Sequence, residues 1–317
     1  MRHTIILILW LLIPRDSLSM MCWNVENFFD WRNGTTTVSD TEFSSYGERH
    51  WTRKRFQAKA NAFAKALFWV EGETGRLPDV VGLEEVENAF VLRQVLQKTS
   101  LRKTDYKYVH YDSPDRRGID VALLYRSSVL ELIDSKPCHL YAADTVMATR
   151  DVLLCVFRRN PPDSTIISVL VNHHPSKYGG ATESEPRRRI AVERLRFLAD
   201  SLAALGIDRI IAGGDFNDIP DNPVFRLLEP ALRPLHMEQF RRGQGTIKYD
   251  GKWDLIDHGY VSPAWSTPTM RILRIPFLLT RDSAHSGEKP LRTYTGPRYT
   301  GGVSDHLPVL LEVRFPP

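Results

Sequence analysis

The sequence predicts a single α/β domain built on mixed β-sheets, and three observations lead to that class. Short apolar runs rich in β-branched residues recur along the chain and are interspersed with segments of helical periodicity. No internal repeat, low-complexity segment or flexible linker divides the 317 residues, a length that one large α/β unit can hold. Hydrophobic residues make up 42% of the chain and charged residues 25%, so we expect an ordinary packed core.

The N-terminal segment has the pattern of an export signal. Arg2 and His3 precede an apolar run over 5–13 that is too short to span a bilayer, and the small residues Ser17 and Ser19 follow it. Signal peptidases prefer small residues at such positions, which predicts cleavage after Ser19. The mature chain would then begin almost within a strand, so retention as an anchor or as a buried strand is the alternative.

We therefore divide the chain into a signal peptide or hydrophobic N-terminal segment at 1–19 and one domain at 20–317. Export to the periplasm, the cell surface or the medium follows, with no stable membrane insertion afterwards. A cytoplasmic location is expected instead if the segment is not a signal. We expect a monomer.

Charge and cysteine usage exclude few functions. The formal net charge of +4 permits a polyanionic partner without requiring one. Cys22, Cys138 and Cys155 are too widely spaced for a C-x-x-C metal site or a disulfide framework. We expect them to be buried free thiols.

Apolar periodicity predicts the elements in order. Strands are expected, in chain order, over 19–25, 78–88, 106–111, 119–125, 151–157, 165–171, 210–212, 253–261 and 303–311. Helices are expected over 52–70, around 91–96, and from Pro186 to Gly206. The basic residues of the first helix, including Lys59, are expected to face solvent. The segment 262–302 is expected to be an arginine- and tyrosine-rich loop.

One buried strand leads directly into polar residues. Ile210, Ile211 and Ala212 precede a Gly213-Gly214 pair, where the glycines are expected to turn the backbone sharply before Asp215 and Asn217. This stretch alone is compatible with an ordinary turn. Other strands, however, end in the same residue types: Asn24 and Glu26, Glu84 and Glu85, His173 and His174, Asp305 and His306, with Asp257 inside a further strand.

These residue types suit a hard divalent cation and phosphoester hydrolysis. Mg²⁺ takes a few carboxylate oxygens and keeps its waters, whereas zinc requires more closely spaced His or Cys ligands. His173 and His174 make a poor zinc pair, because neighbouring strand residues point to opposite faces. Hydrolysis of a phosphoester needs an activated water and stabilisation of charge on the phosphoryl oxygens.

The order of these motifs resembles the endonuclease/exonuclease/phosphatase superfamily, over roughly 20–315. The resemblance is carried by W-N-V-E-N at 23–27, L-E-E-V at 83–86, V-N-H-H at 171–174, G-D-F-N at 214–217, L-I-D-H at 255–258 and S-D-H at 304–306. It implies a deoxyribonuclease I-like, four-layered sandwich of two packed mixed sheets flanked by helices. It also implies a metal-dependent phosphoester hydrolase that uses Mg²⁺ or Mn²⁺.

The resemblance also implies a metal site. Glu85 matches the principal metal ligand, and Asp305 would bind or steer the ion. Asn24 would orient Glu85 or a metal-bound water, and Glu26 would join less directly. Glu84 stands where the family usually has Gln, which implies a supporting position behind the ligands.

Catalytic and substrate-binding roles follow from the same resemblance. His306 would be the general base, oriented by Asp257. Asp215 and Asn217 would align the nucleophile and stabilise the phosphoryl oxygens, and His173 would contact the phosphate or protonate the leaving group. His174 is expected to face the packing side. Arg150 matches a phosphate-contacting arginine of the deoxyribonuclease branch, with a surface salt bridge as the alternative.

Nucleic acid is the substrate that the sequence favours, because the basic segment 262–302 suits a polyanion better than an acyl chain. A phospholipid or small phosphoester substrate is the alternative within the superfamily. A non-catalytic binding protein on the same scaffold is the alternative from another class. Such a protein is expected to have lost at least one of the acids or the base, and all of them are present: Glu85, Asp215, Asp257, Asp305 and His306.

Overall fold

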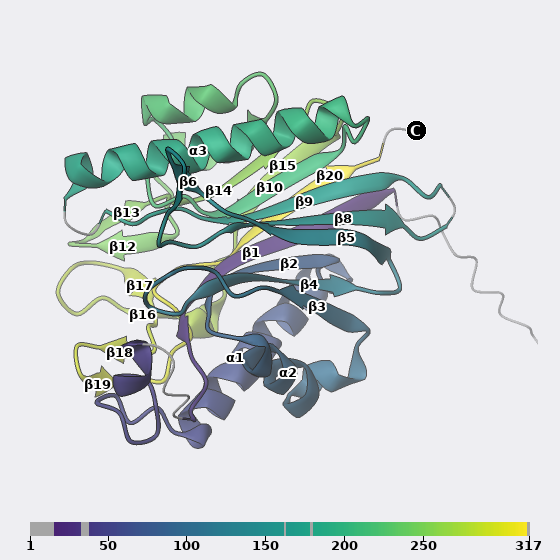
Figure 1. Cartoon of the computed structure of the whole chain (residues 1–317). Helices are drawn as coiled ribbons and strands as arrows, with labels where there is room; N and C mark the ends of the chain where they lie inside the picture. The colour runs from purple at the N-terminus through teal and green to yellow at the C-terminus, as the bar shows by residue number, and fades with distance from the viewer. Residues whose placement is uncertain (1–15, 33–37, 162, 178–179, 316–317) are drawn as a thin grey trace, which may run out of the picture.

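The computed structural model describes residues 16–32, 38–161, 163–177 and 180–315. These residues form two six-stranded sheets packed face to face, with helices on both outer faces (Figure 1). The expected four-layered arrangement of mixed sheets is therefore confirmed. The apolar run at 5–13 lies outside the described residues. None of the described helices is long and apolar enough to cross a membrane.

The two sheets contain the long strands of the chain. The first has the order β15-β20-β1-β2-β4-β3. Its strands are β1 (Ser17–Phe28), β2 (Val80–Val86), β3 (Tyr106–His110), β4 (Asp120–Arg126), β15 (Ser266–Ile272) and β20 (Val309–Arg314). The second has the order β11-β14-β10-β9-β8-β5. Its strands are β5 (Leu130–Cys138), β8 (Val152–Arg159), β9 (Ile166–His173), β10 (Ile210–Asp215), β11 (Arg233–Pro234) and β14 (Asp257–Val261).

Helices and short hairpins complete the molecule. The α-helices are α1 (Arg53–Thr74), α2 (Ala89–Lys98), α3 (Ala181–Ala204) and α4 (Met237–Arg241). The 3-10 helices are η1 (Val38–Thr41), η2 (Ser100–Lys103), η3 (Pro223–Leu228) and η4 (Pro276–Leu278). The two-stranded ribbons are β6 (Tyr141–Ala142) with β7 (Thr145–Val146), β12 (Ile247–Tyr249) with β13 (Lys252–Asp254), β16 (Leu279–Arg281) with β17 (Glu288–Pro290), and β18 (Tyr294–Thr295) with β19 (Arg298–Tyr299).

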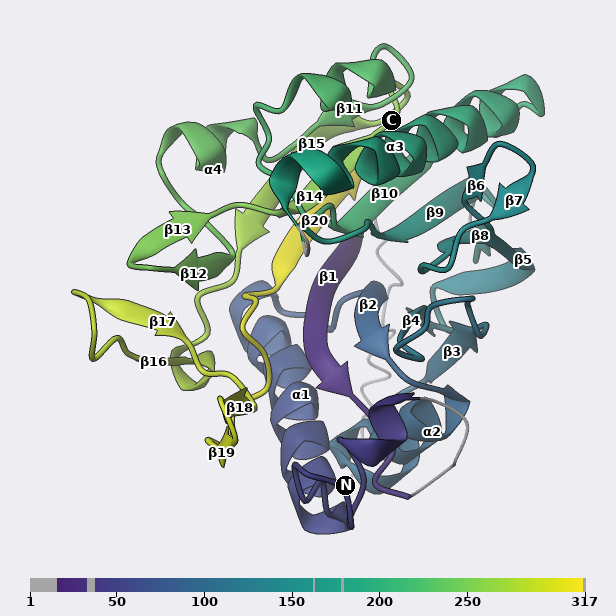
Figure 2. The ribbon, with the colours of Figure 1, turned by 60° about the vertical axis from the view of Figure 1, so that its left-hand side comes forward.

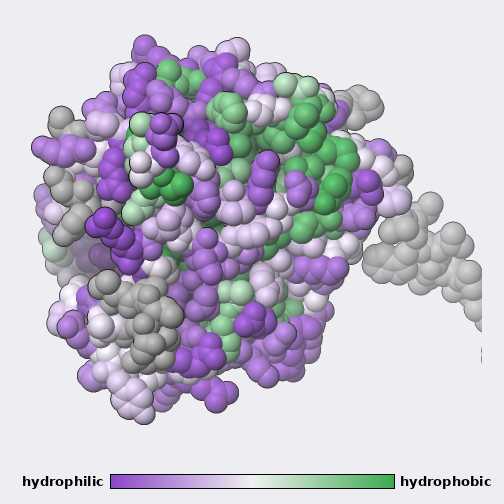
Figure 3. Space-filling view, viewed as in Figure 1, coloured by the Kyte–Doolittle hydropathy of each residue, from purple (hydrophilic) through white to green (hydrophobic). Residues whose placement is uncertain are grey.

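Figure 2 shows three of these ribbons, β12–β13, β16–β17 and β18–β19, grouped on one side of the molecule toward the end of β1. The surface in Figure 3 is mostly polar, with an apolar patch toward its right-hand side, away from the end of β1.

The side chains of β1 alternate between two hydrophobic clusters, one on each face of the sheet. Met21, Trp23 and Val25 pack into the cluster beneath α1 and α2, whereas Met20 and Cys22 pack into the cluster between the two sheets. Successive strand residues point to opposite faces, so a strand covered on both sides must be apolar at almost every position. A third cluster fills the space between α3 and the second sheet. The cysteines are buried and free, as expected.

The glycine pair in β10 does not form a turn, and that expectation is wrong. Gly213 and Gly214 lie inside the strand, which continues to Asp215. A Cβ at Gly213 would lie 2.5 Å from Sγ of Cys22 in the facing sheet, and one at Gly214 would lie 2.0 Å from the carbonyl oxygen of Asn172. Gly214 also has φ +133°. The pair therefore permits close approach of neighbouring strands rather than chain reversal.

Three other boundaries differ from the expectation. The segment 262–302 is not one loop, because it contains the edge strand β15 and two hairpins. The segment 253–261 divides into β13 and β14. Helix α3 begins at Ala181 rather than at Pro186, which lies inside the helix. Strand β5, at an exposed sheet edge, was not expected from the sequence, because its polar and exposed positions hide the apolar pattern.

Strand β1 begins at Ser17, within the predicted N-terminal segment. Ser17, Leu18 and Ser19 pair with β20, and Leu18 is buried. Cleavage after Ser19 would remove this part of the strand. Both the export signal and its cleavage point stay predictions.

Candidate active site

Strand pairing gathers the predicted polar residues at one end of both sheets. Asn24 pairs with Glu84 across the parallel strands β1 and β2. Asp215 pairs with His173 on one side and with Asp257 on the other. The two sheets are joined here by a hydrogen bond, because Nδ2 of Asn24 donates to Oδ2 of Asp215 at 3.0 Å. The end of β1 marks this region in Figures 1 and 2.

Asp215 lies at the centre of the cluster. Its Oδ2 is 3.6 Å from Nε2 of His173 and 3.9 Å from Nε2 of His306. Its Oδ1 accepts a hydrogen bond from the backbone N–H of Asn217 at 2.8 Å. Burial raises the pKa of Asp215 to about 7, which the charge of His306 partly opposes. The carboxylate is thus positioned to take up a proton near neutral pH.

His306 is paired with Asp257 inside the protein. Nδ1 of His306 lies 2.9 Å from Oδ2 of Asp257, which also accepts a hydrogen bond from the hydroxyl of Thr246. Trp23 donates to the carbonyl of His306 at 3.0 Å and fixes its backbone. Burial lowers the pKa of His306, but the charges of Asp257 and Asp215 outweigh burial and hold that pKa well above its ordinary value.

Glu85 is partly buried at a bulge between β1 and β2, with 13% of its side chain exposed. Three residues of β1 lie opposite one residue of β2 between the pairs Asn24–Glu84 and Phe28–Val86. Glu26, Asn27 and Glu85 take left-handed φ values of +46°, +51° and +64°. The backbone N–H of Asn27 donates to Oε2 of Glu85 at 2.8 Å. The bulge therefore holds this carboxylate in a fixed position.

Glu26 and Asp305 lie beside it and share a guanidinium. Nη2 of Arg292 is 2.9 Å from Oε1 of Glu26 and 3.1 Å from Oδ2 of Asp305. The backbone N–H of Thr293 donates to the other oxygen of Glu26 at 2.9 Å. Burial and the charge of Asp305 raise the pKa of Glu26 to about 7.

Glu84 points between the sheets, toward Gly214 of β10. It is fully buried, and neither carboxylate oxygen has a hydrogen-bond partner among the described residues. Burial, followed by the charges of Asp257 and Asp215, raises its pKa well above the ordinary value. Burial without a partner therefore favours the neutral form of this carboxyl group.

The two adjacent histidines face different surroundings. His173 lies near Asp215, whereas the His174 ring packs 4.4 Å from that of Phe216 and its nitrogens have no partner among the described residues. The carbonyl of His174 accepts hydrogen bonds from Asn217 at 2.9 Å and from Arg150 at 2.6 Å. Arg150 is buried and also binds Asp115 at 3.2 Å, so the expected alternative of a surface salt bridge is wrong.

Two cations of the cluster were not expected from the sequence. Lys59 is 1% exposed, so its expected place on the solvated face of α1 is wrong. Its Nζ donates to the carbonyl of Glu26 and, at 2.9 Å, to Oγ1 of Thr293. Its position three residues after Phe56 and four before Phe63, on the apolar face, is the signal that predicts burial. The second cation, Arg117, has Nη2 3.5 Å from Oε2 of Glu85.

The donor set suits a hard divalent cation. Glu85, Glu26 and Asp305 offer carboxylate oxygens near the end of β1, and the described contacts of Glu85 engage Oε2 alone. The guanidinium of Arg292 balances the charges of Glu26 and Asp305, and that of Arg117 balances the charge of Glu85. A bound cation would supply the same positive charge. Oxygen-only donors of this kind fit Mg²⁺ or Mn²⁺.

A second group with metal-ligating atoms lies nearby. His110, Asp112 and Asp120 place one ligand atom each within 4.8 Å of one another. Asp120 pairs with Val86 across β2 and β4, next to Glu85. Its carboxylate already accepts from Ser113 at 2.8 Å and contacts Nε2 of His110 at 3.0 Å.

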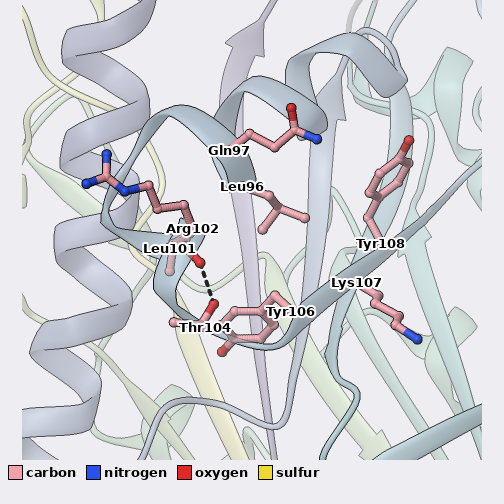
Figure 4. A pocket seen from close by; sticks show the side chains of 8 residues that line it. All are labelled: Leu96, Gln97, Leu101, Arg102, Thr104, Tyr106, Lys107 and Tyr108. Carbon is pink, nitrogen blue, oxygen red and sulfur yellow. Dashed lines mark hydrogen bonds between the residues drawn. The ribbon is translucent and has the colours of Figure 1, made fainter.

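A small cavity of about 130 Å³ adjoins the carboxylates. Its lining includes Glu26, Asn27, Phe43, Arg49, Arg292 and Tyr294. Figure 4 shows a different and larger depression, where Leu96 and Tyr108 point toward a space between α2 and β3. That depression lies toward the start of β3, at the opposite end of the sheet from Glu85.

Comparison with protein-family models shows to which family the chain belongs. Residues 19–315 match the model described as "Endonuclease/Exonuclease/phosphatase family". The chain belongs to this family. Its members are divalent-metal-dependent phosphoester hydrolases, so this endonuclease/exonuclease/phosphatase protein is an enzyme of that class. A search of curated proteins finds no match to the chain.

Solved structures show the same fold at low sequence identity. The human Nocturnin catalytic domain with bound sulfate is 17% identical with a TM-score of 0.59, over 95% of this chain and 96% of that one. The Bacteroides thetaiotaomicron mannosyl-6-phosphatase is 15% identical with a TM-score of 0.59, over 94% and 100%. D. rerio TDP2, solved with a single-strand DNA product, is 16% identical with a TM-score of 0.56, over 94% and 99%.

Proposed function

We propose that this protein hydrolyses phosphodiester bonds of nucleic acid with Mg²⁺ or Mn²⁺. The observation that carries the hydrolytic part is the pair His306–Asp257, in which the second imidazole nitrogen of His306, Nε2, lies 3.9 Å from Asp215. A general base must have one free nitrogen directed at the reacting water while its other nitrogen is held. The fixed Nδ1 contact of His306 leaves Nε2 for that water.

The other predicted residues have roles that fit their positions. Glu85 and Asp305, with Asn24 behind them, would hold the cation, which supplies positive charge to the phosphoryl oxygens. Asp215 would align the attacking water next to Nε2 of His306. His173, 3.6 Å from Asp215, would contact the phosphate or protonate the leaving group.

Two further residues would support the phosphate site from behind. Both Asn217 and Arg150 bind the carbonyl of His174, and Arg150 is buried. Arg150 thus acts on the substrate through its charge and through the position of the 173–174 segment. Asn217 is nearer to solvent and would contact a phosphoryl oxygen directly.

The choice of nucleic acid rests on surface charge around the site. Arg281 and Arg298 are exposed on the hairpins beside the end of β1, and Arg116 is exposed in the turn before β4. D. rerio TDP2 is described with a single-strand DNA product, which supports this choice by analogy. The mannosyl-6-phosphatase supports the second candidate, a phosphomonoesterase that accepts a small substrate in the cavity beside Glu26.

A substrate panel separates the candidates. Purified protein with Mg²⁺ or Mn²⁺ is assayed on plasmid, single-stranded DNA, RNA, sphingomyelin and a small phosphomonoester. A nuclease is expected to lose affinity steeply as salt rises, and the double variant R281A/R298A is expected to reduce that slope. Rapid turnover of the phosphomonoester, with salt-independent and weak turnover of DNA and RNA, would replace the nuclease proposal with the phosphatase one.

Export and a monomeric state complete the proposal. The N-terminal segment at 1–19 supports export, and its start lies outside the described residues. Cell fractionation of the tagged chain, and N-terminal sequencing of the recovered protein, would test both the location and the cleavage point. Light scattering of the purified chain would test the monomer.

A further inference from the structure

Two arginines contact the largely buried acids of the site, one on each side. Nη2 of Arg117 donates to Oδ1 of Asn27 at 2.6 Å and lies 3.5 Å from Glu85. Nη2 of Arg292 lies 2.9 Å from Glu26, the residue before Asn27, and 3.1 Å from Asp305. In Figure 2 the strands β3 and β4, which flank Arg117, lie on the opposite side of the end of β1 from β18, which follows Arg292.

Both guanidinium groups remain accessible. The side chain of Arg117 is 49% exposed and that of Arg292 is 50% exposed. The buried cations of the cluster differ in this respect, because Arg150 and Lys59 are 7% and 1% exposed and donate hydrogen bonds to groups inside the protein. A ligand arriving from solvent meets Arg117 and Arg292 first.

The two guanidiniums also act on the groups that surround the reacting phosphate in the proposed function. The charge of Arg117 contributes to the lowered pKa of His173, after burial and Arg150. Arg292 interacts with Asp305, Glu26 and Glu85, whose charges raise its own pKa against the effect of burial. By their contacts, Arg117 lies on the Glu85 side of the site and Arg292 on the Asp305 side.

We propose that Arg117 and Arg292 form a phosphate clamp that rests on the carboxylates without metal and turns to the phosphoryl oxygens once a divalent cation is bound. The inference rests on the proposed phosphoester hydrolase function. A cation at Glu85 and Asp305 supplies the positive charge that the guanidiniums supply otherwise, and repulsion then favours their release. The planar fork of arginine suits two oxygens of one phosphate.

If the clamp forms, removal of either arginine should change the affinity for Mn²⁺ and the affinity for phosphate in opposite directions. Each of R117A and R292A should bind Mn²⁺ more tightly, by about fivefold or more, because a positive charge that competes with the cation for the carboxylates is removed. Each should bind inorganic phosphate at least about tenfold more weakly in the Mg²⁺-saturated protein, since a hydrogen bond to a charged group is lost. A residue that only maintains structure would weaken both ligands together.

The experiment uses the full chain and two binding readouts that need no turnover. Free Mn²⁺ is measured by electron paramagnetic resonance, and phosphate binding to the Mg²⁺-saturated protein is measured by calorimetry. R102A and R226A are matched controls, because both side chains are exposed, neither forms a described ion pair and neither belongs to the proposed substrate-binding surface. R292K should restore the wild-type Mn²⁺ affinity through its charge but restore only part of the phosphate affinity.

The proposal is overturned if phosphate affinity is unchanged in R117A and R292A, or if Mn²⁺ affinity falls together with it. Near-ultraviolet circular dichroism checks that each variant is folded, and Arg117, on an exposed turn, provides the test if R292A does not fold. Opposite shifts with no nucleic-acid cleavage by the wild type would support the clamp while rejecting the nuclease proposal. Because phosphate is the probe, the two failures are distinguishable.

Discussion

Oδ2 of Asp215 lies 3.9 Å from Nε2 of His306. The two residues are 91 positions apart in the chain, and the distance between these two atoms exceeds that of a direct hydrogen bond. A water that contacts both atoms would have an acceptor for its proton on one side and an aligning carboxylate on the other. The neighbouring contact of His306 with Asp257, at 2.9 Å, fixes which nitrogen is left for that water.

The first prediction concerns the pH dependence of the rate. The base acts only when His306 is deprotonated, and the charge of Asp257 helps to hold the pKa of His306 well above its ordinary value. D257N removes that charge, so the pKa should fall and the acidic limb of the pH–rate profile should move to lower pH. The maximal rate should also fall by about 10²–10⁴, because the base is no longer held. An acidic limb that does not move would show that the charge of Asp257 does not affect the pKa of the group that titrates.

The second prediction concerns metal binding by Glu85. E85Q keeps the shape of the side chain and removes its charge, so the variant should fold but lose most of its Mn²⁺ affinity. Calorimetric titration with Mn²⁺ measures the loss, and the matched control is E131Q, because Glu131 is an exposed acid on β5 that binds Arg158. Equal Mn²⁺ affinity in E85Q and E131Q would place the metal elsewhere, with His110 and Asp120 as the next residues to vary.

The third prediction concerns the buried lysine beneath the site. K59M removes the donor to the carbonyl of Glu26 and to Thr293 and leaves these buried groups without it. The free energy of unfolding should fall by about 1–3 kcal/mol, as for other buried polar groups left unsatisfied. Urea unfolding measures it, and K54M on the exposed face of α1 should stay within about 0.5 kcal/mol of wild type. If K59M were as stable as K54M, the hydrogen bonds of Lys59 would not contribute to folding.

The fourth prediction compares two glycines. G214A places a Cβ 2.0 Å from the carbonyl oxygen of Asn172 at φ +133°, and should destabilise the protein by roughly 2–5 kcal/mol. G72A lies inside α1 with open space around it and should stabilise the protein by about 0.5–1 kcal/mol. The same urea experiment measures both. A neutral G214A would mean that β10 can move away from β9 without loss.

Much of the fold was predictable because a buried strand is visible in the local sequence as a run of apolar residues. β2, β4, β8, β9 and β10 are apolar at almost every position, since both faces are covered. β5 and β15 lie toward sheet edges, where exposed positions interrupt the pattern, and neither was expected. The role of Gly213 and Gly214 depends on Cys22 and Asn172 in neighbouring strands, which no local pattern reports.

The site was predictable to the extent that polar residues follow buried strands. Asn24, Glu85, His173, Asp215 and Asp257 come together because their strands pair in register. The contributions of Lys59, Arg117 and Thr246 depend on helices and loops folding back onto β1 and β14. The spacing of Lys59 from Phe56 and Phe63 indicates its burial but not its partners, and an arginine in a turn has the same local sequence context whether it faces solvent or a carboxylate.

The most direct test of the central claim is the metal-dependent rate of H306A, on whichever panel substrate the wild type hydrolyses fastest. We expect wild-type activity to disappear with a chelator and to return with Mg²⁺ or Mn²⁺, and H306A to lose about 10²–10⁴ of the rate while staying folded. H174A, whose ring packs against Phe216, should be less stable but should keep most of the rate. Full activity in excess chelator, or near wild-type turnover by H306A while H174A is inactive, would contradict the account.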